Sequence, residues 1–537
     1  MATLSSGVET IVEDQPTCVT LNGEPCSPYE EKAAVFHQIE QPKAKYDTIG
    51  TAWNAIHDPF INKLPPEIAS HILCLSLTTL NNGDDDPNAM YGQWSIIRKD
   101  WAAPLKLGSV CCKWRQLAWS TPNLWTTVHI RIKPSMTAST AESLPGLLRE
   151  WLGRSGALPL TVYFFPYHEF TNFALQDDLL DINPTDTWTD TLDVAAGLVI
   201  GILNFYSGRW RNLYLKASAD MLVRFSGSAE PKQLVSLELS DTMADDSPSL
   251  APQKFMMESE LSPTHLKLTY FRLTSISLRW DNITHATLSA ITDEETLDFL
   301  RRASNLEYFY ALSYDSSVIT IQTPIFLPQL RSLDLGTRNL ENILGAITLP
   351  SLKEWTQKTY GEGLPVAAII SFLERSGCPL KVLNLETAPP PRDLDLISLF
   401  QALHSLEYLC LRFRDGVNPA IVMDDILTRI FCSVPRSSDI RVDAPLDSFL
   451  PNLRSMEYYR SWEGPPLSWD RIPELYHQGH RRSLTLKCSA FNRDIRYQTA
   501  LRLLQLVDEG VDLQIPHATQ NGDFLENFRN VMREGSP

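Results

Sequence analysis

Two kinds of hydrophobic spacing divide this chain. Between residues 58 and 130 the apolar positions recur at intervals of three and four, the spacing of amphipathic helices. Further along, leucines alternate with polar residues in short runs, which is the spacing of half-buried strands. The pattern predicts an α/β chain in which a short all-helical module precedes a long array of strand-and-helix units.

The alternating runs return along residues 131–490. The clearest copies read Leu-x-x-Leu-x-Leu and have their central leucines at Leu213, Leu237, Leu333, Leu383 and Leu409. Weaker copies lie near Leu266, Ile283, Leu306, Leu352 and Leu453. Most recur at roughly 20–29 residues, the period of leucine-rich repeats, and one unit is degenerate or missing between Leu409 and Met456. Because the asparagine ladder of regular repeats is mostly absent, we expect an irregular solenoid of stacked units.

Glycine and asparagine mark the expected helix ends. Arg154-Ser155-Gly156 and Arg375-Ser376-Gly377 are near copies, and Ala303-Ser304-Asn305 is similar, so each predicts a left-handed helix cap. Residues 491–537 should form a C-terminal cap and tail, with a helix over 493–509 and a last strand at 511–515. Residues 1–57 read as a lead-in with one short helix from Tyr29.

Composition narrows the class of protein. The chain has 537 residues and a formal net charge of −17, which argues against binding nucleic acid. Its nine cysteines show neither a CxxC pair nor a disulfide rhythm, and the N-terminus lacks the pattern of a secretory signal. The uncharged stretch 194–206 is too short to span a bilayer and predicts a buried helix. We therefore expect a cytoplasmic or nuclear protein that does not bind membranes.

Motifs of enzymes and of metal sites are missing from the sequence. No phosphate-binding loop, dinucleotide fingerprint or nucleophile elbow occurs. His168-Glu169 begins like a zinc-protease helix, but Asn172 occupies the position of the second histidine. The sequence predicts a protein that is not an enzyme, with no cofactor and no metal ion.

The helical region begins at Leu64-Pro65-Pro66-Glu67-Ile68, where the prolines suit a first helical turn. Ile68, Ile72 and Leu75 follow at helical spacing. A polar insertion covers about 78–104, and a second helix is expected from near Lys106, with Leu107, Val110, Cys111, Trp114 and Leu117 on one face. Two short helices cannot bury so much apolar surface alone, so another element or a partner must cover it.

Three blocks in order carry a resemblance. They are residues 64–68 (LPPEI), residues 107–115 (LGSVCCKWR) and residues 120–125 (STPNLW). Together they resemble an F-box, of the kind abundant in mushroom-forming fungi, although the insertion is longer than the compact domain carries. The resemblance implies binding to a Skp-type adaptor subunit and, through it, to a cullin ligase. Carried over position by position, the implied contacts are Leu64, Pro65, Ile68 and Ile72 in a first strip, and Val110, Cys111 and Trp114 in a second.

A target surface is expected on the strands. Residues that flank each central leucine should face the concave side of the array. They are Tyr214, Ser236, Glu238, Tyr308, Ser332, Asp334, Asn384, Tyr408, Glu457 and Tyr459. Tyrosines and carboxylates recur among these positions and basic residues are few. The sequence therefore predicts a target with a basic segment.

The leading hypothesis is a substrate-recognition adaptor of a Skp–cullin–F-box ubiquitin ligase. It would act by holding a target protein near a ubiquitin carrier, which needs two binding surfaces and a stiff spacer. One alternative is a leucine-rich scaffold that acts without ubiquitination, and another is a hydrolase with an unrecognised site.

Overall fold

The computed structural model describes residues 45, 48–49, 63–78, 102–166, 188–241, 255, 257–315, 323–359, 364–387, 396–413, 426–427, 429–430, 449–460, 469–477, 484–489, 495–516 and 522–534. Nearly all of the predicted lead-in, including the helix from Tyr29, and nearly all of the predicted insertion at 78–104 lie outside these residues. The chain divides into two compact units. The helical unit comprises Met1–Thr126 and Glu150–Leu158, and the sheet unit comprises Thr127–Arg149 and Pro159–Pro537.

Three α-helices and one 3-10 turn of the helical unit have described bounds before Thr127. They are α3 (Pro66–Thr78), α4 (Ala103–Val110), α5 (Cys112–Trp119) and η2 (Pro122–Trp125). The start of α3 at Pro66 is as predicted. The single helix expected from Lys106 is wrong, because the backbone at Cys111 is extended (φ −159°, ψ 173°) and separates α4 from α5. Arg115 holds this break, since its Nε donates to the Gly108 carbonyl at 2.9 Å.

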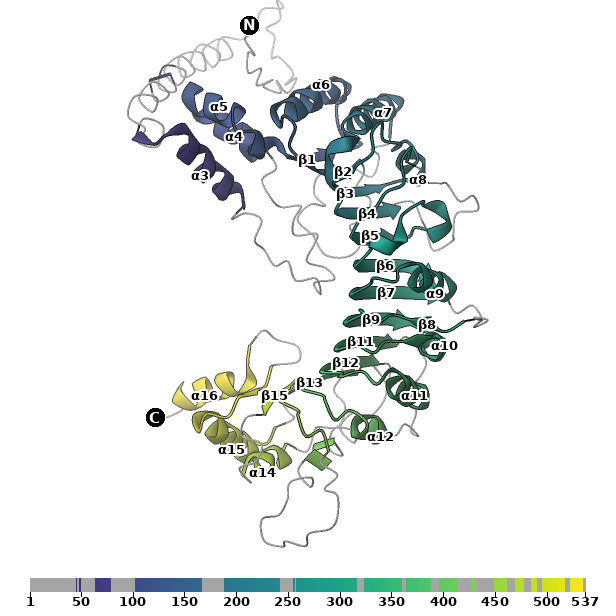
Figure 1. Cartoon of the computed structure of the whole chain (residues 1–537). Helices are drawn as coiled ribbons and strands as arrows, with labels where there is room; N and C mark the ends of the chain where they lie inside the picture. The colour runs from purple at the N-terminus through teal and green to yellow at the C-terminus, as the bar shows by residue number, and fades with distance from the viewer. Residues whose placement is uncertain are drawn as a thin grey trace, which may run out of the picture. The chain divides into compact units, whose positions relative to one another are not determined.

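The sheet unit is built on one parallel sheet of fourteen strands, counted over the described residues. Neighbouring strands in this sheet follow chain order, so the chain advances along it without reversing direction (Figure 1). The predicted α/β class is confirmed. The strands are β1 (Thr127–Arg131), β2 (Leu160–Phe165), β3 (Trp210–Ala217), β4 (Ser236–Asp241), β5 (His265–Thr269), β6 (His285–Thr292), β7 (Tyr308–Asp315), β9 (Ser332–Thr337), β11 (Glu354–Thr359), β12 (Val382–Thr387), β13 (Tyr408–Phe413), β14 (Ser455–Arg460), β15 (Thr485–Cys488) and β16 (Leu513–Gln514). A separate parallel pair joins β8 (Ile325–Phe326) to β10 (Ile347–Thr348).

Helices fill most of the intervals between strands. In Figure 1 the helices α9 to α12 lie along one side of strands β6 to β13. The α-helices beyond Thr127 are α6 (Ala138–Arg154), α7 (Asp190–Phe205), α8 (Ala219–Leu222), α9 (Asp293–Arg302), α10 (Leu340–Ala346), α11 (Val366–Ser376), α12 (Leu396–Gln401), α14 (Arg471–His477), α15 (Tyr497–Asp508) and α16 (Phe524–Glu534). None of the helices in the described ranges is long and apolar enough to cross a bilayer.

The leucines of the repeating pattern form the core of the sheet unit. Leu213 pairs in register with Leu237, and both are fully buried. The same register aligns Leu333, Trp355, Leu383, Leu409 and Met456, each at most 1% exposed. Stacking identical positions on neighbouring strands gives a continuous apolar layer that no single unit could bury alone.

The predicted helix caps are confirmed at the two glycines. Gly156 and Gly377 have φ of +58° and +57°, the left-handed region that glycine adopts without strain. The third cap is wrong, because Ala303 ends α9 with φ −97°. Asn305 has another role there. Its side-chain amide donates to the Asp281 carbonyl at 2.7 Å and so connects one repeat of the sheet unit to the preceding repeat.

Two boundaries differ from the sequence prediction, whereas the long interval after Leu409 agrees with it. The sheet begins with β1 at Thr127, inside the range 58–130 predicted for the helical module, because β1 pairs with β2 over five positions. Strands β13 and β14 are direct neighbours, which explains the double interval after Leu409. Helix α16 lies in the predicted tail, where Asp523 caps it by accepting hydrogen bonds from the Leu525 and Glu526 amides.

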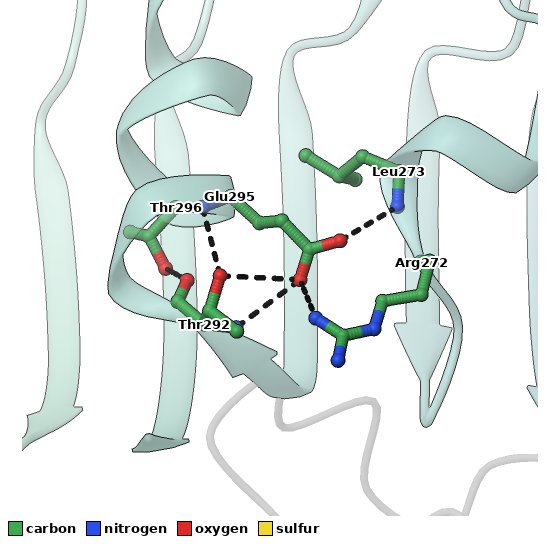
Figure 2. Close-up of polar contacts among 5 residues, drawn as sticks. All are labelled: Arg272, Leu273, Thr292, Glu295 and Thr296. Carbon is green, nitrogen blue, oxygen red and sulfur yellow. Dashed lines mark hydrogen bonds and ion pairs between the residues drawn. The ribbon is translucent and has the colours of Figure 1, made fainter. Parts of the chain in front are cut away.

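A capping box on α9 also connects two successive repeats of the sheet unit (Figure 2). The Thr292 hydroxyl accepts from the Glu295 amide at 3.1 Å, and the Glu295 carboxylate accepts from the Thr292 amide at 3.2 Å. The same carboxylate accepts from Arg272 at 3.0 Å and from the Leu273 amide at 3.3 Å. One side chain therefore satisfies backbone donors of its own helix and of the turn that follows β5.

Glu295→Ala should lower the free energy of unfolding by about 2 kcal/mol, because it removes a cap and leaves part-buried amides without an acceptor. Chemical denaturation followed by circular dichroism measures this loss. Glu294→Ala is the matched control: Glu294 is exposed in the same helical turn, so its loss should cost less than about 0.5 kcal/mol. Equal effects of the two changes would contradict the role of Glu295 in joining the units.

Gln357 interrupts the buried layer of leucines. It is aligned with Leu335 and Leu385, it is fully buried, and its Oε1 has no hydrogen-bond partner among the described residues. An unpaired buried amide oxygen is destabilising, whereas leucine has a similar volume and no polar atom. Gln357→Leu should therefore stabilise the protein by about 1–2 kcal/mol, seen as a higher denaturant midpoint. A lower midpoint would show that the hydrogen bond from Gln357 Nε2 to the Lys358 carbonyl, at 3.2 Å, outweighs the cost of the unpaired oxygen.

Candidate partner-binding surfaces

Helix α3 is apolar on two sides. Ala69 and Leu73 are 1% and 2% exposed, and they form the side that packs inward. Ile68, Ile72 and Leu75 are spaced by four and three residues, and they are 49%, 39% and 49% exposed. A helix at a protein surface normally turns its polar side outward, so the exposed side of α3 needs another explanation.

The interior of the helical unit is complete without these residues. Leu73, Ala118, Leu124 and Trp125 form its buried cluster, with Trp114, Leu117 and Trp151 packed around it. Trp125 is fully buried, and its indole N–H donates to the Ala118 carbonyl at 2.8 Å. The Arg154 guanidinium lies 4.4 Å from the ring centroid of Trp119 and 4.7 Å from that of Trp125.

The structure divides the seven predicted adaptor contacts into three groups. Pro65, Ile68, Ile72 and Val110 are exposed. Leu64 and Trp114 are half-buried, and Trp114 packs against the internal cluster. Cys111 is only 2% exposed at the break between α4 and α5, so its thiol belongs to the interior and does not contribute to an exposed strip.

Sequence reasoning missed one member of the exposed set. Leu105 on α4 is 50% exposed, and Val110 on the same helix is 41% exposed. Leu105 was not predicted, because the helix was expected to start one residue later, near Lys106. We call Ile68, Ile72, Leu75, Leu105 and Val110 the exposed apolar set. Several exposed apolar side chains on two short helices of one module are typical of a surface that binds another protein.

The second candidate surface is the polar face of the sheet, formed by the side chains that alternate with the buried leucines. The six predicted target residues all lie on it, and all are half-buried. Tyr214 pairs in register with Glu238, Tyr310 with Asp334, and Cys410 with Glu457. Tyr308 and Tyr408 lie two residues before Tyr310 and Cys410, and alternation puts them on the same face.

Three carboxylates of this face are paired with lysines. Glu238 lies 3.1 Å from the Lys267 ammonium, Asp334 lies 3.2 Å from Lys358, and Glu457 lies 3.9 Å from Lys487. Burial raises the pKa of Asp334, and the ammonium of Lys358 opposes that shift. The prediction that basic side chains are few on this face is wrong. It considered the strongest repeats, whereas the lysines lie on the neighbouring, weaker ones.

Aromatic side chains stack across the first three strands. His129 and Tyr163 have ring centroids 4.4 Å apart and planes 3° apart, and Tyr163 and Tyr214 follow at 4.5 Å and 5°. A second stack joins His265 to His285 at 4.4 Å. Rings that stack between adjacent strands stand on edge over the sheet, so they direct their edges away from it.

Among the described lysines of this face, Lys216 has the most strongly shifted pKa. Burial is the main reason that the pKa of Lys216 is lowered to about 8; Glu238 opposes the shift and the ammonium of Lys267 adds to it. Glu238 therefore lies between two ammonium groups. At neutral pH most Lys216 side chains remain protonated, so the three residues together carry one excess positive charge.

Comparison with models of protein families found none that matches this chain, and comparison with curated proteins found no match either.

Proposed function

We propose that this protein is a substrate-recognition adaptor of a Skp–cullin–F-box ubiquitin ligase. In this proposal the helical unit acts as an F-box and binds a Skp-type subunit. The sheet unit acts as an irregular leucine-rich-repeat solenoid and binds a target protein. No step of covalent chemistry is assigned to the chain, so its contribution is to raise the local concentration of the target near the ubiquitin carrier.

The observation that carries the proposal is the exposed apolar set on α3 and α4. Two of its members, Ile68 and Val110, belong to the first two of the three sequence blocks that resemble an F-box, and the other three lie beside those blocks in the sequence. Leu124 and Trp125 of the third block are buried and belong to the cluster that packs against α3. Some motif residues are therefore buried inside the module, and others are apolar and exposed. Such a module is suited to binding one partner helix or helical subunit.

The sheet unit supports the second half of the proposal. A long parallel sheet that advances in one direction presents many polar side chains on one face, and this is the surface that repeat proteins use for binding. The stacked aromatic rings and paired charges of this face offer both apolar contact and hydrogen bonds.

Affinity purification tests the proposal. The full chain and a variant carrying Ile68→Glu and Ile72→Glu are tagged in cells, and their partners are identified by mass spectrometry. The Skp-type subunit and a cullin should be recovered with the natural chain and lost with the variant, while targets are retained. Recovery of the Skp-type subunit without a cullin would favour the scaffold alternative, and recovery of neither would reject the proposal.

A further inference from the structure

Charge is distributed unevenly along the polar face of the sheet. On β1 to β6 the described residues of this face include Arg131, Lys216 and Lys267 but only one carboxylate, Glu238. On β7 to β16 they include three bases and four acids, namely Lys358, Arg412, Lys487, Asp334, Glu354, Glu386 and Glu457. The first part has an excess of positive charge in a chain whose net charge is −17.

Three features of β1 to β6 reinforce this excess. Lys216 and Lys267 share the single carboxylate of Glu238, and the Lys267 ammonium is 3.1 Å from it. Register places Ser240, Thr269 and Ser289 in the row that continues from Lys216, so hydroxyl groups lie beside the ammonium. Histidines 129, 265 and 285 lie on the same face and add imidazole groups that can donate hydrogen bonds.

The aromatic stack adds a surface suited to the same kind of ligand. His129, Tyr163 and Tyr214 present ring edges, which carry the positive side of the aromatic quadrupole. Phe165 lies beside Tyr163, with ring centroids 6.2 Å apart. Apolar side chains of a ligand can pack on these rings while its acceptors meet the rim and the lysines.

We propose that the polar face of strands β1 to β6 binds an acidic segment of a partner protein that also carries apolar or aromatic side chains. This rests on the proposed function, in which that partner is the target, and it reverses the basic target expected from the sequence. A nucleic acid is the less favoured polyanion, because the chain as a whole is strongly negative and Glu238 lies within the basic region.

Fluorescence anisotropy with the full-length chain tests this inference. The probes are a labelled peptide in which glutamates alternate with tyrosines and leucines, and a counterpart in which every glutamate is lysine. The acidic peptide should bind more tightly, and its affinity should fall as salt is raised. Tighter binding of the basic peptide would overturn the inference.

Two matched double variants locate the site. Lys216→Gln with Lys267→Gln should weaken acidic-peptide binding at least about fivefold, because two cations next to the ligand are removed. Lys358→Gln with Lys487→Gln should change it less than about twofold, because those lysines lie many strands away and are screened. Lys216→Arg with Lys267→Arg should retain binding, which separates loss of charge from loss of folding.

Equal effects of the two glutamine pairs would overturn the location of the site. Displacement of the peptide by a single-stranded oligonucleotide at lower concentration than by unlabelled peptide would overturn the choice of an acidic protein segment as the ligand. Binding of a Skp-type subunit is measured on the same preparations. Loss of peptide binding in every form, with subunit binding intact, rejects this inference alone. Peptide binding without subunit binding rejects the proposed adaptor function and leaves the acidic-segment site in place.

Discussion

Replacing Ile68 and Ile72 together with glutamate should reduce binding of a Skp-type subunit by about 100- to 1,000-fold. The two side chains are 49% and 39% exposed and belong to the exposed apolar set, so a partner that covers α3 must desolvate them. Two carboxylates placed in such an interface would each remain buried without a counter-charge. Surface plasmon resonance with the purified full chain measures the loss.

Helix α7 offers a matched control for this change. Val194 and Leu198 have the same four-residue spacing as Ile68 and Ile72, and they are 62% and 51% exposed. Val194→Glu with Leu198→Glu should leave subunit binding within about twofold of the natural chain, because α7 is outside the proposed interface. Both double variants should melt close to the natural chain. If the α7 variant lost binding as severely as the α3 variant, the interface would not be specific to α3.

Trp125→Ala should unfold the helical unit while leaving the sheet unit folded. The side chain is fully buried, donates to the Ala118 carbonyl at 2.8 Å, and contacts Trp151 edge to face with centroids 4.7 Å apart. Removing a buried tryptophan costs about 3–5 kcal/mol, which approaches the whole stability of a small module. Hydrogen exchange on the full chain should show loss of protection in α3, α4 and α5 but not in β2 to β14.

Two further variants separate the causes of this loss. Trp125→Phe keeps most of the apolar volume and removes the indole donor, so it should cost about 1–2 kcal/mol. Trp119→Ala changes a ring that is 43% exposed, and it should cost less than Trp125→Ala by several-fold. Full protection of α3 in the Trp125→Ala protein would contradict a central role for this side chain.

Much of the sheet unit could be predicted because its signal is local. The alternation around Leu213, Leu333 and Leu383 depends only on which residues of a strand are buried, and the structure buries those leucines. Strand β1 was missed because Thr127–Arg131 follows the third motif block directly, so the helical pattern was extended over it. Cys111 shows a different limit, since its thiol fits the helical spacing but only the fold reveals that the backbone is extended there.

The charges of the polar face could not be predicted from single strands. Glu238 and Asp334 read as free acids when each repeat is considered alone. Their lysine partners lie on the next strands, and only the register places Lys267 beside Glu238 and brings Lys358 close to Asp334. An ion pair between a residue of a weak repeat and a residue of a strong repeat therefore cannot be predicted until the two strands are aligned.

Titration calorimetry of the purified full-length chain with a purified Skp-type subunit tests the proposed adaptor function most directly. We expect a one-to-one complex with a dissociation constant below about 1 μM and a negative heat-capacity change, because an apolar surface is buried. Absence of binding at subunit concentrations of about 100 μM, with the helical unit shown to be folded by hydrogen exchange, would contradict it.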